Sequence, residues 1–254
     1  MSGKIETARA APEGFSKSEE ARRALMRATE RCIAENGLAG APLKAIHAAA
    51  GQRNMSATQY HFGSREALIG ATLDDRMPRL ETRRRTLLEA EMAAHDGLPP
   101  LRNILAVWIR TLAEELHPKP EGNFYLRFID NLRHQSASEF ADRIIALQPV
   151  YATIFRLIDQ HLAALPLPLR ARQSRIGLAA EQSISALARL EADIQALLPG
   201  KAHYPAAAVE LLVDYVTGGL TAPLSEASLA IVADPASVDF HLNFFPLARR
   251  SDAD

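Results

Sequence analysis

The chain has little cysteine: Cys32 is the only one in 254 residues. One thiol cannot form a disulfide within the chain, so a disulfide-stabilised scaffold is excluded, and so is a metal site built on several cysteines. The sequence also lacks a His-Glu-x-x-His motif, a glycine-rich phosphate loop and a nucleophile elbow. We therefore expect no metal site, no cofactor and no enzymatic activity.

Long hydrophobic runs are missing as well. The longest stretch free of Asp, Glu, Lys and Arg covers only residues 144–155, and it contains Pro149. A membrane-spanning helix needs about 20 apolar residues, and residues 1–15 lack the continuous apolar run of a secretory signal. We therefore expect no membrane partner and a cytoplasmic location.

Alternating apolar and polar residues, the pattern of a half-buried strand, do not occur over a useful length. Instead, 15 prolines divide the chain into segments of helical length. Ser16 and Glu19 have the spacing of a capping box before an apolar stretch with helical periodicity. A further helix is expected over 64–94, and the pair Gly218-Gly219 is expected to end a late one. The sequence predicts an all-α fold that begins near Ser16, with residues 1–15 as a flexible arm.

Residues 41–69 read APLKAIHAAAGQRNMSATQYHFGSREALI and have the pattern of a helix-turn-helix. Leu43 and Ile46 lie on the inner face of a short first helix, and Gly51 stands where two packed helices turn closely. The helix that follows has polar side chains on its outer face. Side chains of this kind reach base edges and phosphates in DNA-binding proteins. The pattern therefore predicts a DNA-reading second helix.

This stretch resembles the N-terminal DNA-binding domain of the TetR (tetracycline repressor) family over about residues 16–70. The matching positions are Ile46, Ala50, Gly51, His61, Phe62, Ser64, Arg65, Glu66 and Leu68. Four features depart from the family pattern. Ala41-Pro42 replaces the usual threonine cap of the first helix of the motif, and Gln59 rather than tyrosine falls at the usual phosphate-contact position. His47 stands where alanine is usual, and the turn before the second helix is one residue longer.

The resemblance implies two domains after the flexible arm of residues 1–15. Residues 16–66 would form a three-helix helix-turn-helix domain, and residues 67–254 a helical domain for effector binding and dimerisation. The expected phosphate contacts are Lys44, Tyr60, His61 and Arg65, and the expected base contacts are Arg53, Asn54, Ser56, Thr58 and Gln59. Two alternatives stay open: His61 only packs beside Phe62, and Thr58 faces the first helix.

The charges are distributed in the way that DNA binding favours. Residues 1–62 hold nine Lys and Arg against six Asp and Glu, and the remainder holds 20 against 24, although the whole chain has a net charge of −1. A basic N-terminal part on an acidic body is the expected electrostatic pattern of a DNA-binding protein. A small excess of this size also occurs on ordinary solvated helices, so it supports the motif rather than standing alone.

Members of the resembled family bind palindromic operators as homodimers, with recognition helices about 34–36 Å apart or a multiple of a helical turn. Two apolar stripes late in the chain are the candidates for the dimer interface. They consist of Ile176, Ala180, Ser183, Leu187, Leu190 and Ile194, and of Val209, Leu212, Val213 and Val216. The alternative is that both stripes are buried within one subunit.

The middle of the chain is the expected place of a small-molecule site. Its apolar lining would come from Trp108, Phe124, Tyr125, Phe128 and Phe155, and its polar contacts from His134 and His161. The resemblance implies a repressor that a small, largely apolar effector releases from its double-stranded DNA operator by tilting the helix at 64–94. The alternative for each of these residues is an ordinary place in a helical core.

Two other functions compete with this interpretation. A helical-bundle enzyme is one, because Glu114-x-x-His117 has the spacing found in di-iron bundles. Such bundles need two of these motifs and two further glutamates, whereas the sequence has one motif. The other is a small-molecule-binding protein of the same fold that no longer binds DNA, as the altered turn allows.

Overall fold

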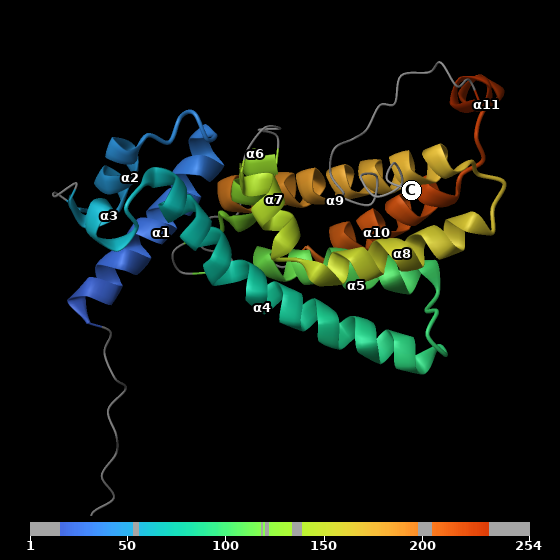
Figure 1. Ribbon diagram of the computed structural model, residues 1–254, viewed down its shortest axis with the longest axis horizontal. Coiled ribbons are helices and arrows are strands. Elements are labelled where there is room, and N and C mark those ends of the chain that lie inside the picture. The colour runs from blue at the N-terminus through green and yellow to red at the C-terminus, as the bar shows by residue number, and fades with distance from the viewer. Residues whose placement is uncertain are drawn as a thin grey trace, which may run out of the picture.

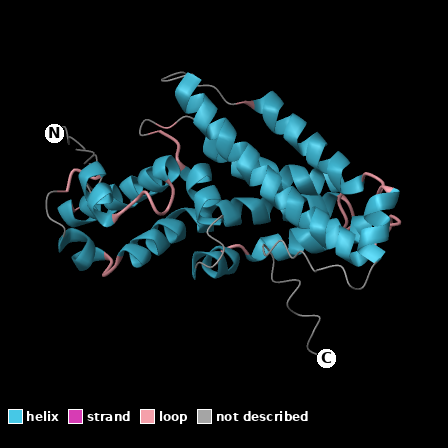
Figure 2. Ribbon diagram, turned by 90° about the horizontal axis from the view of Figure 1, so that it is seen from above, coloured by secondary structure: helices cyan, strands magenta, loops and turns pink. Residues whose placement is uncertain are grey.

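The computed structural model describes residues 16–52, 56–117, 119, 122–133, 139–197 and 205–233. All regular secondary structure in these ranges is helical, which confirms the predicted all-α fold (Figure 2). None of the described helices is both long enough and apolar enough to cross a membrane. The predicted arm at residues 1–15 lies outside the described residues.

The helices follow one another along the chain as α1 (Lys17–Asn36), α2 (Leu43–Ala49), α3 (Ser56–His61), α4 (Arg65–Ala94), α5 (Leu101–Ala113), the 3-10 helix η1 (Glu114–Leu116), α6 (Tyr125–Arg133), α7 (Glu139–Ala146), α8 (Pro149–Ala163), α9 (Leu169–Leu197), α10 (Ala206–Thr221) and α11 (Glu226–Ala233). Ser16 caps α1 as predicted, because its hydroxyl accepts the Glu19 N–H at 3.2 Å. Ser64 caps α4 by accepting the Ala67 N–H at 3.0 Å. The expected end of α10 at Gly218-Gly219 is wrong, since the helix continues through both glycines to Thr221.

Helices α1, α2 and α3 gather at one end of the molecule, and the long α4 runs from them along the remaining helices (Figure 1). We call α1–α3 with the first turn of α4 the head, and the helices from α5 onward the body. Helix α1 packs on α4 and α6, which join the head to the body. Helix α5 is the centre of the body, since it contacts α4, α8, α9 and α10.

The two stripes expected at a dimer interface lie in the core of the single chain instead. Ile176, Ala180, Ser183 and Leu187 of α9 are buried, and so are Val209, Val213 and Val216 of α10. The remaining members, Leu190, Ile194 and Leu212, are half-buried and pack against the same core. The seven buried residues therefore serve the core of the single chain and not a dimer interface, whereas the assignment of Leu190, Ile194 and Leu212 to that interface stays a prediction. The periodicity of the two stripes reflects packing of α9 on α6 and α8, and of α10 on α5.

Candidate nucleic-acid interface

The turn between α2 and α3 depends on a backbone conformation that glycine favours. Gly51 has a φ of +66°, in the left-handed region that most residues avoid. A Cβ at this position would meet no atom of the described residues within 4 Å. Among these residues no close approach of two helices requires glycine here, and the positive φ accounts for it instead. Residues 53–55, between this turn and α3, lie outside the described residues.

A buried hydrogen bond joins the two short helices. The Thr58 hydroxyl of α3 and Nε2 of His47 in α2 lie 2.7 Å apart, and Thr58 is 1% exposed. Thr58 therefore cannot reach a base edge, and its prediction as a base contact is wrong. The pair also explains the departure at His47: the side chain that replaces the usual alanine holds the position of α3.

The outer surface of α2 and α3 is polar and accessible. Lys44 and Gln59 are exposed, and Tyr60 is 82% exposed. The half-buried His61 ring lies edge-on to Tyr60, with 4.9 Å between ring centroids, and 6.1 Å from the ring of Phe62. Phe62 packs against the core and lies beneath the guanidinium of Arg22, at 5.5 Å. The structure thus brings Lys44, Gln59, Tyr60 and His61 to the surface of the head.

Arg65 has a structural role that the sequence did not indicate. Its Nε donates to the Ala41 carbonyl at 2.9 Å, and its Nη2 donates to the Leu38 carbonyl. Both acceptors belong to the connection between α1 and α2, so the side chain fixes the start of α4 against that connection. Arg65 is half-buried, and its assignment as a phosphate contact stays a prediction.

Three of the expected DNA contacts have no described side chain. Arg53 and Asn54 lie outside the described residues, and of Ser56 the structure describes only its place at the start of α3. Their assignment as base contacts stays a prediction.

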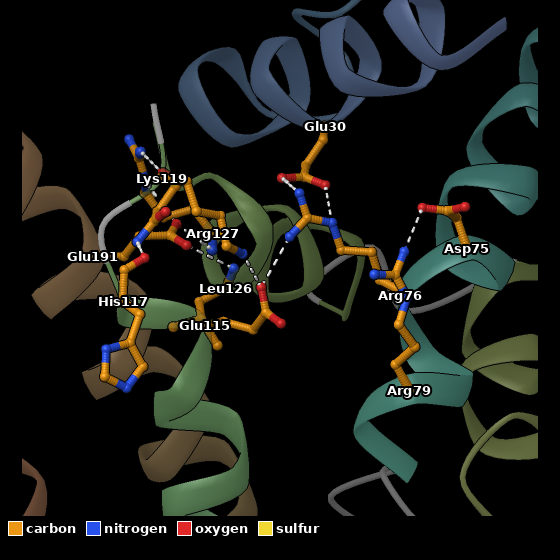
Figure 3. A network of polar contacts seen from close by, with 11 residues as sticks. Glu30, Asp75, Arg76, Arg79, Glu115, His117, Lys119, Leu126, Arg127 and Glu191 are labelled. Carbon is orange, nitrogen blue, oxygen red and sulfur yellow. Dashed lines mark hydrogen bonds and ion pairs between the residues drawn. The ribbon is translucent and has the colours of Figure 1, made fainter. Parts of the chain in front are cut away.

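The head is tied to the body by a network of charged side chains around Arg76 of α4 (Figure 3). Its Nε lies 3.0 Å from Glu30 Oε2, and its Nη2 donates to Glu30 Oε1 at 3.1 Å. Its Nη1 donates to Glu115 Oε2 at 2.9 Å. One guanidinium therefore links α1 in the head to η1 in the body, through a planar fork that suits carboxylates.

Burial makes two carboxyl groups of this network hold their protons more tightly than exposed carboxyl groups do. Burial raises the pKa of Glu30 to about 7, although the charges of Arg76 and Lys119 oppose the shift. Burial also raises the pKa of Glu191, which accepts the backbone N–H groups of Leu126 at 3.0 Å and Arg127 at 3.1 Å. Glu191 thereby completes the first turn of α6, the helix on which α1 packs.

The spacing of charged and apolar residues along α4 is a sequence signal for this network. Arg76, Leu80, Arg84 and Leu88 recur every four residues, which places two arginines in the apolar stripe of α4. Leu80, Arg84 and Leu88 are buried, and Arg76 is half-buried. A charged residue within an apolar stripe indicates a buried partner of opposite charge.

The residues expected to line a small-molecule site lie in the body. The five aromatic residues among them, Trp108, Phe124, Tyr125, Phe128 and Phe155, are all buried. Trp108 meets Phe155 edge-on at 5.5 Å, so these two do come together. His161 lies in the last turn of α8, where its Nε2 donates to the Pro99 carbonyl at 2.8 Å. His134 lies outside the described residues.

Neither a protein-family model nor a curated protein matches the sequence. Solved structures do resemble the fold. NalD from Pseudomonas aeruginosa, described as the secondary repressor of a multidrug efflux pump, is 19% identical, with 81% of this chain and 100% of NalD covered and a TM-score of 0.41. FadR from Bacillus subtilis, a transcriptional regulator solved with stearoyl-CoA, is 14% identical, with coverages of 80% and 99% and a TM-score of 0.47.

A third solved structure carries the name of the family that the helix-turn-helix motif resembles. It is a candidate TetR-family transcriptional regulator from Rhodococcus sp., 18% identical, with coverages of 79% and 97% and a TM-score of 0.46. These values describe a similarity of helical fold. The function has to be argued from the residues of this chain.

Proposed function

We propose that the protein is a DNA-binding transcriptional regulator of the TetR type, a repressor that leaves a palindromic operator when it binds a small molecule. The observation that carries the proposal is the head, in which a short helix with an exposed polar face is fixed by the buried His47–Thr58 pair. Gln59 and Tyr60 project from that helix, and Lys44 supplies a positive charge beside it. An operator-binding protein works where the DNA is, so we also propose a cytoplasmic location.

Within this proposal, Lys44 and Tyr60 contact phosphates and Gln59 reads a base. Phosphate contacts supply affinity and orientation, whereas a glutamine amide can bind adenine through two hydrogen bonds. His61 assists as a phosphate contact from the end of α3. Arg53, Asn54 and Ser56 complete the proposed base-reading set.

A palindromic operator requires two copies of the head, and we propose that the outer faces of α9 and α10 form the homodimer interface. Large apolar side chains are exposed there: Leu178 of α9, and Leu211 and Tyr215 of α10, which are 69% and 62% exposed. A Cβ on Gly218 or Gly219 of α10 would meet no atom of the described part of the chain within 4 Å. Exposed apolar side chains beside small residues favour close packing of a second copy.

The proposal is tested by a mobility-shift assay on the DNA upstream of the gene that encodes the protein. Wild-type protein should retard this DNA, and the double substitution Gln59→Ala with Tyr60→Ala should weaken binding at least tenfold. Gln160→Ala, an exposed glutamine of α8 far from the head, serves as the control and should bind as wild type does. Equal binding by the double variant would remove α3 from the interface.

If the wild-type protein retards no DNA even at low salt, the proposed regulator function is wrong and the alternative function is favoured. The chain would then be a small-molecule-binding protein that has kept the fold without its operator. Direct measurement of ligand binding separates the two cases, because it does not depend on DNA.

A further inference from the structure

Arg84, in the middle of α4, is a buried cation with incomplete hydrogen bonding. Its side chain is 1% exposed, and its Nη1 donates to Glu81 Oε2 at 2.8 Å. The other two nitrogens, Nε and Nη2, are buried and meet no acceptor within the described part of the chain. Buried donors are nearly always paired, because each unpaired one loses its hydrogen bonds to water without replacement. The Nε and Nη2 edge of the guanidinium is therefore able to bind an acceptor.

The surroundings of Arg84 are aromatic. The guanidinium lies over the ring of Tyr151 in α8, 4.3 Å from its centroid. The Tyr151 hydroxyl accepts the indole N–H of Trp108 at 3.0 Å, and Trp108 in turn meets Phe155 edge-on. Aromatic rings beside a cation suit a molecule with an apolar or aromatic body, because most small-molecule sites combine apolar side chains with a few polar groups.

The charges in this region leave a positive excess beside Arg84. Glu81, its carboxylate partner, also accepts the backbone N–H of Val150 in the first turn of α8. One negative charge is thus shared between a guanidinium and a helix N-terminus, which carries a partial positive charge. A second buried arginine, Arg133 of α6, pairs with Glu181 at 2.7 Å.

We propose that Arg84 anchors the carboxylate of a small effector whose remainder is apolar or aromatic. Nε and Nη2 form one edge of the planar guanidinium fork, and that edge matches the two oxygens of a carboxylate. A phosphate monoester is disfavoured because it carries more charge, which is costly to remove from water among aromatic rings. This inference rests on the proposed function and sharpens it: the effector is an apolar acid rather than a neutral apolar molecule.

The position of Arg84 connects the proposed site with the head. Tyr125 of α6 lies under the guanidinium of Arg76, at 5.5 Å. Arg76 and Arg84 belong to one helix, and Arg76 holds Glu30 of α1. An acid that pairs with Arg84 therefore binds two turns along α4 from the link between body and head.

The experiment uses the intrinsic fluorescence of Trp108, the one tryptophan of the chain, which adjoins Tyr151. Octanoate and phenylacetate are titrated into the full-length protein, and octanamide and phenylacetamide serve as neutral analogues of the same shape. We expect at least one acid to change the emission in a saturable manner, and its amide to bind at least tenfold more weakly.

Variants of α4 assign the binding to Arg84. Arg84→Met keeps the length of the side chain without its donors and should weaken binding of the acid at least tenfold. Arg84→Lys keeps the charge without the planar fork, and its affinity for the acid should lie between that of Arg84→Met and that of wild type. Arg85→Met changes the next residue, which is exposed, and should bind as wild type does.

Arg84→Met leaves Glu81 without its cation, so the double variant Glu81→Gln with Arg84→Met is measured beside it, and circular dichroism establishes that both are helical. The inference is overturned if acid and amide bind equally, if folded Arg84→Met variants bind the acid as wild type does, or if no acid changes the emission. A wild-type protein that binds operator DNA but no acid refutes this site alone. One that binds the acid but no DNA refutes the proposed regulator instead.

Discussion

At the scale of single residues, buried polar side chains define the two regions that matter most. His47 and Thr58 fix α3 in the head, and Arg76 with Glu30 fixes the head to the body. At each of these positions an apolar side chain could fill the same space, but it could not form the hydrogen bond or ion pair. Buried polar groups of this kind specify one arrangement, because their hydrogen bonds are lost when the helices shift.

Thr58→Val is expected to destabilise the protein by about 1–2 kcal/mol. Valine has nearly the same shape, but it leaves His47 buried without its hydroxyl partner. Chemical denaturation with a two-state analysis measures the change. Thr82→Val, on an exposed turn of α4, is the matched control and should change stability by less than about 0.5 kcal/mol. Equal effects of the two substitutions would contradict a role for the His47–Thr58 bond.

Glu30 makes stability depend on pH. Its pKa in the folded protein is raised to about 7 from 4.5. Between these values the folded state binds more protons than the unfolded state, so Glu30 makes stability fall as pH rises from about 5 to 7. Over this pH range the free energy of unfolding of Glu30→Gln should decrease by roughly 1–3 kcal/mol less than that of wild type, since one pKa unit corresponds to about 1.4 kcal/mol.

The pH effect is measured as the difference in free energy of unfolding between Glu30→Gln and wild type at pH 5 and pH 7. Arg76, Glu115, Lys119 and Glu191 surround the carboxyl and are present in both proteins, so their own titration largely cancels. A difference that stays constant across this range would show that Glu30 is ionised at pH 5 despite its burial.

At the scale of helices, the sequence patterns predicted which helices form better than they predicted what each helix contacts. Capping by Ser16 and the helix expected over 64–94, which contains Pro78, are confirmed. The pattern in α9 correctly indicated a buried stripe but not its partner, because a periodic apolar stripe looks alike whether α5, α6, α8 or a second chain covers it. Hydrogen bonds between distant segments, such as Arg65 with Ala41, leave no periodic signal and could not be predicted.

Gly51→Ala tests why the turn between α2 and α3 needs glycine. The substitution should cost about 1 kcal/mol, because alanine is strained at a φ of +66° even though space is open around it. Gly51→Asn should cost less, since asparagine tolerates the left-handed region better. Chemical denaturation of wild type and the two variants ranks their free energies of unfolding. A larger loss of stability for Gly51→Asn than for Gly51→Ala would point to steric crowding instead.

At the scale of the whole molecule, the account requires two chains for one operator. Leu211→Glu with Tyr215→Glu should convert a dimer into a monomer, because it places four negative charges in the proposed interface of the pair. Light scattering at micromolar concentration measures the mass. The control is Leu229→Glu, an exposed leucine of α11, which should leave the dimer intact. A wild-type monomer would contradict the proposed interface.

The central claim is that the head binds a specific DNA sequence, and the most direct measurement is the affinity of the wild-type protein for two labelled duplexes of equal length. One carries the DNA upstream of its gene, and the other carries the same bases in shuffled order. Fluorescence anisotropy at several salt concentrations should show at least a hundredfold preference for the upstream duplex, with affinity that falls as salt rises. Equal affinity for both duplexes, or no binding at low salt, would contradict the account.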